Sequence, residues 1–294
     1  MAVQLLLVLA ICVVAQAQVP HFGNGLVKGY IATPIIDEAS GLAASRIHEG
    51  ILYTHNDHGD GPTIYAINAS DASLVATLTI GSGATNHDWE DVAVGPCAKG
   101  EHVFCIYIAD TGFSSANDDE ANIIYRVQEP DSLTDQTLTV NSTLKFEWSE
   151  EESQALMVDP EANVYIVSNV LSGRGMFVKL PNVWGQAVPT HVASTTFLPI
   201  RTTHHDPTAA DISPDGKRLL IKAKRHIYYW NVPDGDYLAA VTKTPYELPY
   251  IHESVGESIC WDYTSESYFT LGEGHYKPLY EYEPLSLDES FVVG

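Results

Sequence analysis

The stretch EDVAVGPCAKGEHVFCIYIADTG, residues 90–112, places two short apolar runs on either side of a polar turn, with carboxylates near both ends. Runs rich in Val and Ile around a Gly-containing turn predict an antiparallel hairpin. A third run, IIYRVQEP, follows at 123–130. Similar runs, separated by Gly, Pro, Asn and Asp, continue along the chain, and no long segment has the 3.6-residue apolar period of a helix. The sequence therefore predicts an all-β protein.

Strands of this kind recur in one fixed order. Each unit opens with an acidic residue before a small-apolar strand, followed by a second strand and a third strand with a central aromatic residue. A fourth strand is predicted between units, in LVATLTI, LKFEW, THVASTTF and YELPYI. The opening residues are separated by steps of 52, 62, 59 and 46 residues; they are Glu38, Glu90, Glu152, Asp211 and Glu257. Four strands per unit of this length are typical of β-propeller blades. We predict a propeller of five four-stranded antiparallel blades, with six as the alternative because the 62-residue step has room for more strands.

The fifth unit lacks an obvious outer strand. The segment GLVKGYIA, residues 25–32, could supply that strand and close the ring. A doubled β-sandwich is the competing architecture, but it does not explain five units in one order. Trp230 and the recurring tyrosines are expected to be core residues between blades.

The first residues, MAVQLLLVLAICVVAQAQ, form a short apolar run that ends in a small-x-small pattern, typical of a secretory signal peptide cleaved after Ala17. We therefore expect a signal peptide at 1–17 and a single propeller domain at 18–294. No later segment has the ~20 apolar residues of a membrane span. Two glycosylation sequons, at Asn68 and Asn141, agree with a secreted, extracellular protein.

The spacing of the cysteines also agrees with a secreted protein. Cys12 lies in the signal peptide, and Cys97 and Cys105 flank the turn AKGEHVF. In an oxidising environment these two are the natural disulfide pair. Cys260 is then left over and is expected to be a buried thiol.

The formal net charge is -23. Such a chain repels nucleic acid and anionic membranes, and it attracts cations. Solubility in an extracellular fluid is the simpler explanation of the charge, and calcium binding is the other.

In a propeller, the first residue of each inner strand and the last residue of the second strand meet at one mouth of the channel. That geometry predicts a ring of acidic and amide side chains: Glu38, Asn56, Asp57, Glu90, Asp91, Asp110, Glu152, Asp211, Glu257 and Glu273. Asp88 stands with Glu90 and Asp91 in the contribution of the second blade. Carboxylates so close together must be partly protonated or neutralised by a cation.

Hard oxygen ligands and an extracellular setting indicate Ca²⁺ as that cation. No EF-hand loop is present, so the site would be assembled from several blades. HNDHGDGP at 55–62 resembles a ligand loop, although Asp-Gly is equally a turn signal. The alternative reading is that the carboxylates cap backbone N–H groups of the inner strands.

Other chemistry is sparse. No nucleophile elbow, zinc-protease motif or phosphate-binding glycine loop occurs. His204-His205-Asp206 could ligate a metal or supply a base, but a solvated loop explains it as well. A cationic group ends the second strand of the fourth unit and would face the acidic mouth; it consists of Lys222, Lys224, Arg225 and His226. It could hold a small anion through a bridging metal, or simply balance charge.

The segments DWEDVAVGP, IYRVQEP and TAADISPDGKRLLIKAKRHIYYW give the chain a wider resemblance. Over about residues 36–284 it resembles secreted, mostly uncharacterised propeller proteins of bacterial type, related loosely to phytase-like and esterase-like propellers. The resemblance implies a propeller fold and suggests metal-dependent hydrolysis. The chain departs from the pattern at IADTG and at Ser153-Gln154, and both departures remove acidic or amide groups from the mouth.

Two functions follow as expectations. The first is a secreted, acidic, calcium-binding propeller without catalysis, in a body fluid or matrix that could be calcified, with calcium, mineral or a small anion as its partner. The alternative is a metal-dependent hydrolase of phosphoesters or related esters.

Overall fold

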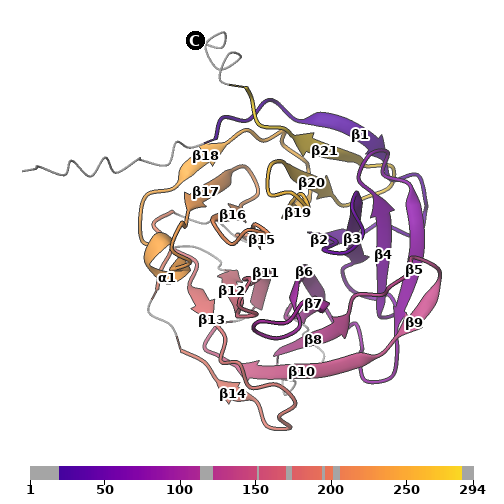
Figure 1. The fold of residues 1–294 in the computed structure, drawn as a ribbon, viewed down its shortest axis with the longest axis vertical. Helices are drawn as coiled ribbons and strands as arrows, with labels where there is room; N and C mark the ends of the chain where they lie inside the picture. The colour runs from indigo at the N-terminus through magenta and orange to yellow at the C-terminus, as the bar shows by residue number, and fades with distance from the viewer. Residues whose placement is uncertain are drawn as a thin grey trace, which may run out of the picture.

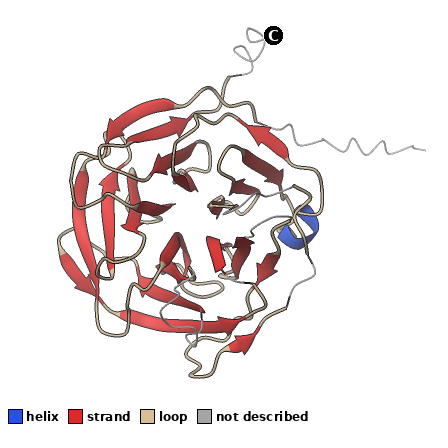
Figure 2. Cartoon of the chain, turned by 180° about the vertical axis from the view of Figure 1, so that it is seen from behind, coloured by secondary structure: helices blue, strands red, loops and turns tan. Residues whose placement is uncertain are grey.

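The protein is a ring of five small β-sheets around a central channel, as the computed structural model shows for residues 20–112, 122–150, 152–169, 174–193, 196–200 and 206–286 (Figure 1). The predicted all-β, five-bladed propeller is confirmed. Within these ranges the one helix, α1 (Tyr237–Ala240), is a single turn, drawn in blue in Figure 2. The predicted signal peptide, Cys12, His204 and His205 lie outside the described residues. No helix within the described ranges is long and apolar enough to cross a membrane.

Each blade begins at the channel and adds strands outward. Blade 1 contains β2 (Ala39–Ala44), β3 (Ile51–Asn56), β4 (Thr63–Asn68) and β5 (Leu74–Ile80). Blade 2 contains β6 (Trp89–Pro96), β7 (Phe104–Asp110), β8 (Asn122–Gln128) and β10 (Val140–Glu147). Blade 3 contains β11 (Glu152–Val158), β12 (Val164–Asn169) and β13 (Phe177–Lys179). Blade 4 contains β15 (Ala209–Ile212), β16 (Arg218–Lys222), β17 (Ile227–Asn231) and β18 (Tyr246–Leu248). Blade 5 contains β19 (Gly256–Trp261), β20 (Tyr268–Gly272) and β21 (Pro278–Tyr282).

The ring closes as predicted from the sequence. Strand β1 (Leu26–Tyr30) comes from the beginning of the described chain and pairs antiparallel with β21 of blade 5. Leu26 lies opposite Glu281, and Tyr30 lies opposite Pro278. Blade 5 therefore obtains its outer strand, β1, from the N-terminal side of the described chain. This pairing joins the last blade to the segment that precedes the first blade.

Blade 3 departs from the predicted four strands. The segment expected to form its outer strand, THVASTTF, instead gives β14 (Thr190–His191), which pairs parallel with β10 of blade 2. Only an isolated bridge, Met176 to Phe197, returns to blade 3. Pro181 and Pro189 lie between β13 and β14, and proline cannot donate to a strand ladder. A second unpredicted strand, β9 (Gln136–Leu138), extends blade 1 by parallel pairing with β5.

Apolar side chains fill the five spaces between neighbouring blades. Trp89 and Tyr125 belong to the cluster between blades 1 and 2, and Trp261 and Tyr268 to the cluster between blades 4 and 5. Trp230 is buried between blades 3 and 4, as expected. Each large side chain buried in this way contributes roughly 1.5–3 kcal/mol of hydrophobic free energy. Packing between neighbouring blades therefore supplies the hydrophobic core of the ring.

Four inner strands begin with a β-bulge, where two residues face one residue of the second strand. The bulged pairs are Ser40–Gly41, Glu90–Asp91, Gln154–Ala155 and Glu257–Ser258. Bulges re-aim side chains at the ends of strands. Strand β15 of blade 4 pairs in regular register over its described length.

The disulfide between Cys97 and Cys105 is present, with a Cα–Cα distance of 5.0 Å, and it closes the β6–β7 hairpin as predicted. Cys260 is free and buried, also as predicted. Burial raises the pKa of its thiol, so it behaves as a small apolar side chain.

Candidate metal centre at one mouth of the channel

Carboxylates from four blades meet where the inner strands begin. We call this group the acidic mouth. It contains six residues named from the sequence together with Asp88, and its members are Glu38, Asp57, Asp88, Glu90, Glu152, Glu257 and Glu273. They are far apart in the sequence, but their charges act on one another because the inner strands begin side by side.

Two pairs of carboxyl groups face each other at the acidic mouth. Asp57 and Asp88 present oxygen atoms within 4.8 Å of each other, and Glu257 acts on Glu273. Like charges at such short range disfavour ionisation, so each pair favours retaining a proton or binding a cation. Burial, followed by the neighbouring Asp57, raises the pKa of Asp88 to about 7. Burial, followed by Glu257, raises the pKa of Glu273 to about 9.

Glu90 is the most deeply buried carboxylate of the acidic mouth, with 4% of its surface exposed. Burial raises its pKa well above the usual range, and the charges of Asp57, Asp88, Glu152 and Glu257 raise it further. Glu90 and Glu257 occupy the same position of the bulge in blades 2 and 5. The bulge is therefore the backbone feature that places both glutamates at the mouth.

Gly112, just after β7, packs directly against this cluster. A Cβ atom at this position would overlap the carboxylates of Asp88 and Glu90. Its backbone N–H donates to the carbonyl oxygen of Asp88 at 3.1 Å. Glycine is required here because the two carboxylates fill the space that a side chain would take.

Asp57, His58 and Asp88 can each present one ligand atom within 4.8 Å of the others, a separation that a single metal ion can span. Within the part of the chain that the structure describes, the buried Oδ1 atom of Asp57 has no hydrogen-bond partner. The sequence predicts Asp88 as part of the second blade's contribution to the ring, but it does not single out His58. The signal for His58 lies in the ligand-like stretch at 55–62.

Two of the predicted ligands support the cluster and do not belong to it. The Oδ1 atom of Asn56 accepts the backbone N–H groups of Asp37 at 3.2 Å and Glu38 at 3.3 Å. The Oδ1 atom of Asp110 accepts the backbone N–H of Asp88 at 2.9 Å. Both side chains are occupied in fixing the loops that carry the acidic mouth.

Asp91 and Asp211 are buried and bond to backbone N–H groups of neighbouring blades. Asp91 accepts the backbone N–H groups of Val92 and Leu156, each at 2.8 Å, and so links blade 2 to blade 3. Asp211 accepts the backbone N–H of Trp261 at 2.8 Å and so links blade 4 to blade 5. For these two residues, the contacts favour the alternative of carboxylates that cap inner-strand N–H groups.

Lys222 supplies the cation beside the acidic mouth. Its side chain is fully buried, and its Nζ atom donates to the carbonyl oxygen of Gly256 and to Oγ1 of Thr208. Burial lowers its pKa to about 8, against the opposing charges of Glu253 and Glu257. The other cations predicted with it lie elsewhere; His226, for example, pairs with Glu247 on β18 at 2.9 Å.

No protein-family model matches the chain, and no curated protein matches it. Solved structures do. The PQQ-bound form of aldose sugar dehydrogenase from Streptomyces coelicolor is 11% identical, with a TM-score of 0.49, over 90% of this chain and 99% of that chain. U3-55K and the RRP9 WD40 repeats are each 12% identical, with TM-scores of 0.40, over 84% of this chain and 68% and 67% of theirs. The chain is a β-propeller. At these identities the likeness concerns the fold alone.

Proposed function

We propose that this protein is a secreted, non-catalytic propeller that binds Ca²⁺ at the acidic mouth, in an extracellular fluid or a matrix, including a calcified one. The observation that carries the proposal is the convergence of carboxylates from neighbouring blades: Asp57 and Asp88 present oxygen atoms within 4.8 Å, and the buried Glu90 carboxylate lies with that of Asp88 against Gly112. A divalent cation replaces the protons that these groups retain and removes the repulsion among them.

The ligand chemistry favours Ca²⁺ over softer ions. Ca²⁺ takes six to eight oxygen ligands in flexible geometry. The acidic mouth offers carboxylate oxygens from Asp57, Asp88 and Glu90, with further carboxylates around them. His58 is exposed and already pairs with Asp57 at 3.4 Å, so the imidazole stands at the edge of the oxygen cluster.

His55 supports the non-catalytic part of the proposal. This histidine is fully buried near the mouth, with Nδ1 3.0 Å from the carbonyl oxygen of Asn56 and Nε2 accepting the N–H of Gly41 at 3.3 Å. Burial lowers its pKa to about 4. Both ring nitrogens are occupied, so His55 is a structural group and not a general base.

The second candidate is a metal-dependent hydrolase of phosphoesters or related esters. It is favoured by buried Lys222, which could balance an anionic ester near a metal at the mouth. In that case the bound ion would polarise the phosphoryl oxygen.

Calorimetric titration of Ca²⁺ into EDTA-treated protein tests the proposal. We expect stoichiometric binding that is lost in the double variant Asp88→Asn, Glu90→Gln and kept in Glu161→Gln, a control on the opposite face. Failure of the wild type to bind millimolar Ca²⁺ would disprove calcium binding. A panel of phosphoesters with bound Ca²⁺ then separates the candidates, because turnover that Asp88→Asn abolishes would establish the hydrolase.

A further inference from the structure

The mouth of the channel opposite the acidic mouth holds a cavity of about 470 Å³. All five blades line it through the turns after their inner strands. The contributing residues include Arg46 of blade 1, Phe104 of blade 2, Val158 of blade 3, Pro214 of blade 4 and Tyr263 of blade 5. The volume lies in the range of small-molecule sites, roughly 300–1,000 Å³.

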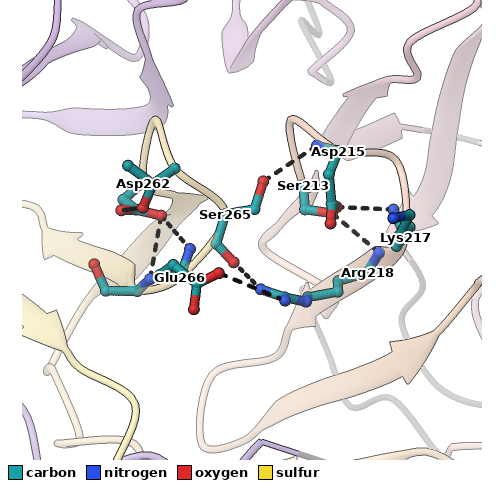
Figure 3. Close-up of polar contacts among 9 residues, drawn as sticks. Ser213, Asp215, Lys217, Arg218, Asp262, Ser265 and Glu266 are labelled. Atoms are coloured by element: carbon teal, nitrogen blue, oxygen red, sulfur yellow. Dashed lines mark hydrogen bonds and ion pairs between the residues drawn. The ribbon is translucent and has the colours of Figure 1, made fainter. Parts of the chain in front are cut away.

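The walls of this cavity are held in place before any ligand arrives. The disulfide between Cys97 and Cys105 fixes the hairpin of blade 2. In Figure 3, the turns of blades 4 and 5 are tied together: the backbone N–H of Asp215 donates to Oγ of Ser265 at 3.1 Å, and the guanidinium of Arg218 donates to the carbonyl oxygen of Ser265. A preformed site loses little entropy when it binds.

Arg46 is the only Lys or Arg among the residues that line the cavity. One of its N–H groups donates to the carbonyl oxygen of Ala44 at 2.7 Å, and a guanidinium carries five such donors. Its charge opposes the raised pKa values of Asp211 and of Glu129, whose carboxylate oxygens accept the backbone N–H of Arg46 at 3.2 and 3.3 Å. Nearby cations are engaged elsewhere, since Lys99 pairs with Glu161 and Arg218 lies 3.8 Å from Glu266.

The rest of the lining contains both apolar and acidic side chains. The apolar ones include Val94, Phe104, Val158 and Tyr263. The acidic ones are Glu101, Glu161 and the buried Asp159, and their charges repel ligands that carry several negative charges. One cation among apolar side chains matches one carboxylate on an apolar body.

We propose that this cavity binds a small monocarboxylic acid with an apolar or aromatic body. The carboxylate accepts two parallel N–H bonds from Arg46, the geometry that a guanidinium offers to a planar anion. The body of the ligand packs against Phe104 and Tyr263. This site is independent of the calcium site proposed above, and no residue is shared between them.

Matched acid and amide probes test the assignment: benzoate against benzamide, and hexanoate against hexanamide, by saturation-transfer NMR and calorimetry. A hydrogen bond to a charged group is worth ~1.5–3 kcal/mol, so each acid should bind roughly tenfold or more tightly than its amide. Arg46→Gln should abolish this difference, and Lys145→Gln, which removes a cation on the outer strand β10, should leave it unchanged. Equal binding of acid and amide, or no binding of either acid at millimolar concentration, would overturn the proposal.

Thermal unfolding checks that each variant is folded. If Arg46→Gln fails to fold, Arg46→Lys keeps the charge and loses the parallel geometry, so it should weaken the acids and leave the amides unchanged. An Arg46→Lys protein that binds the acids like the wild type would refute the role of Arg46. The calcium-site variant Glu90→Gln should bind benzoate normally, so failure here is separable from failure of calcium binding.

Discussion

Asp57 and Asp88 belong to different blades, yet their carboxyl groups present oxygen atoms within 4.8 Å of each other at the mouth of the channel. Two carboxylates this close repel each other when both are ionised, so the pair marks a place where positive charge is missing. The surrounding residues keep the pair together, since Asp110 holds the backbone of Asp88 and Gly112 leaves room for its side chain. The proximity of Asp57 and Asp88 leads to predictions that distinguish calcium ligands from the residues that support them.

Addition of Ca²⁺ to EDTA-treated protein should raise the melting temperature. Binding to the folded state alone adds about 2.7 kcal/mol of stability at a hundredfold excess over Kd. The variant Asp88→Asn, Glu90→Gln should lose most of this shift, because it removes two ligands, and it should remain folded without metal. Differential scanning calorimetry with and without Ca²⁺ measures both effects. An unchanged wild-type melting temperature would contradict the prediction.

Metal-free protein should be more stable at pH 5 than at pH 8.5. Asp88 and Asp211 have pKa values raised to about 7, and Glu273 to about 9, so the folded state retains protons that the unfolded chain releases near pH 4. Their contribution is complete below about pH 4 and is lost as the pH rises through 7 to 9. Urea unfolding across this range in EDTA should show the decline, and saturating Ca²⁺ should reduce it. A flat or rising profile in EDTA would be inconsistent with retained protons.

Gly112→Ala should weaken Ca²⁺ binding more than any other single methyl group added nearby. Its Cβ would overlap the carboxylates of Asp88 and Glu90 and push them apart. Gly61→Ala is the matched control, because nothing lies within 4 Å of the Cβ that it adds. Calorimetric affinities of the two variants give the comparison. Equal affinities would place the ion elsewhere.

Asp91→Asn should destabilise the fold and leave calcium affinity intact. The buried Asp91 carboxylate accepts two backbone N–H groups, and an amide can accept one while its NH₂ faces the other. A buried donor left without a partner costs about 1–3 kcal/mol. Chemical denaturation of the variant measures its stability, and calcium titration of the same sample measures its affinity. A loss of calcium affinity with an unchanged free energy of unfolding would identify Asp91 as a calcium ligand.

Replacement of both Cys97 and Cys105 by Ser should lower the free energy of unfolding by about 2–3 kcal/mol, since the closed loop is short. Benzoate binding should weaken, because the disulfide holds one wall of the cavity, and Ca²⁺ binding at the other mouth should not change. Peptide mapping without reduction identifies the bond directly. Two free thiols in secreted protein would contradict it.

The order of the blades and the closure of the ring could be predicted from the sequence, because both depend on local signals. Strand period, turn residues and the unpaired segment at 25–32 are visible in single stretches of chain. The outer strand of blade 3 was mispredicted because THVASTTF has strand composition, and pairing with β10 of blade 2 is decided by tertiary contacts.

The candidate site was predictable as a region but not residue by residue. Five acidic residues opened the units, yet only Glu90 and Glu257 occupy equivalent positions in the bulges. Asp211 comes from a regular strand, so its side chain lies in the channel and bonds to blade 5. A bulge shifts the register by one residue, and its position is set by neighbouring strands that composition does not reveal.

The closure of the ring by β1 has a consequence for biosynthesis. As the chain leaves the ribosome, β1 appears before every other described strand, and its partner β21 appears after all of them. The strand must therefore wait with an unpaired edge, the state in which strands of different molecules join and aggregate. Lys28, in the middle of β1, discourages such joining while the strand waits, and it then pairs with Glu281 at 2.7 Å once the correct partner arrives. In the folded ring, this ion pair lies across the β1–β21 junction, where the two ends of the described chain meet.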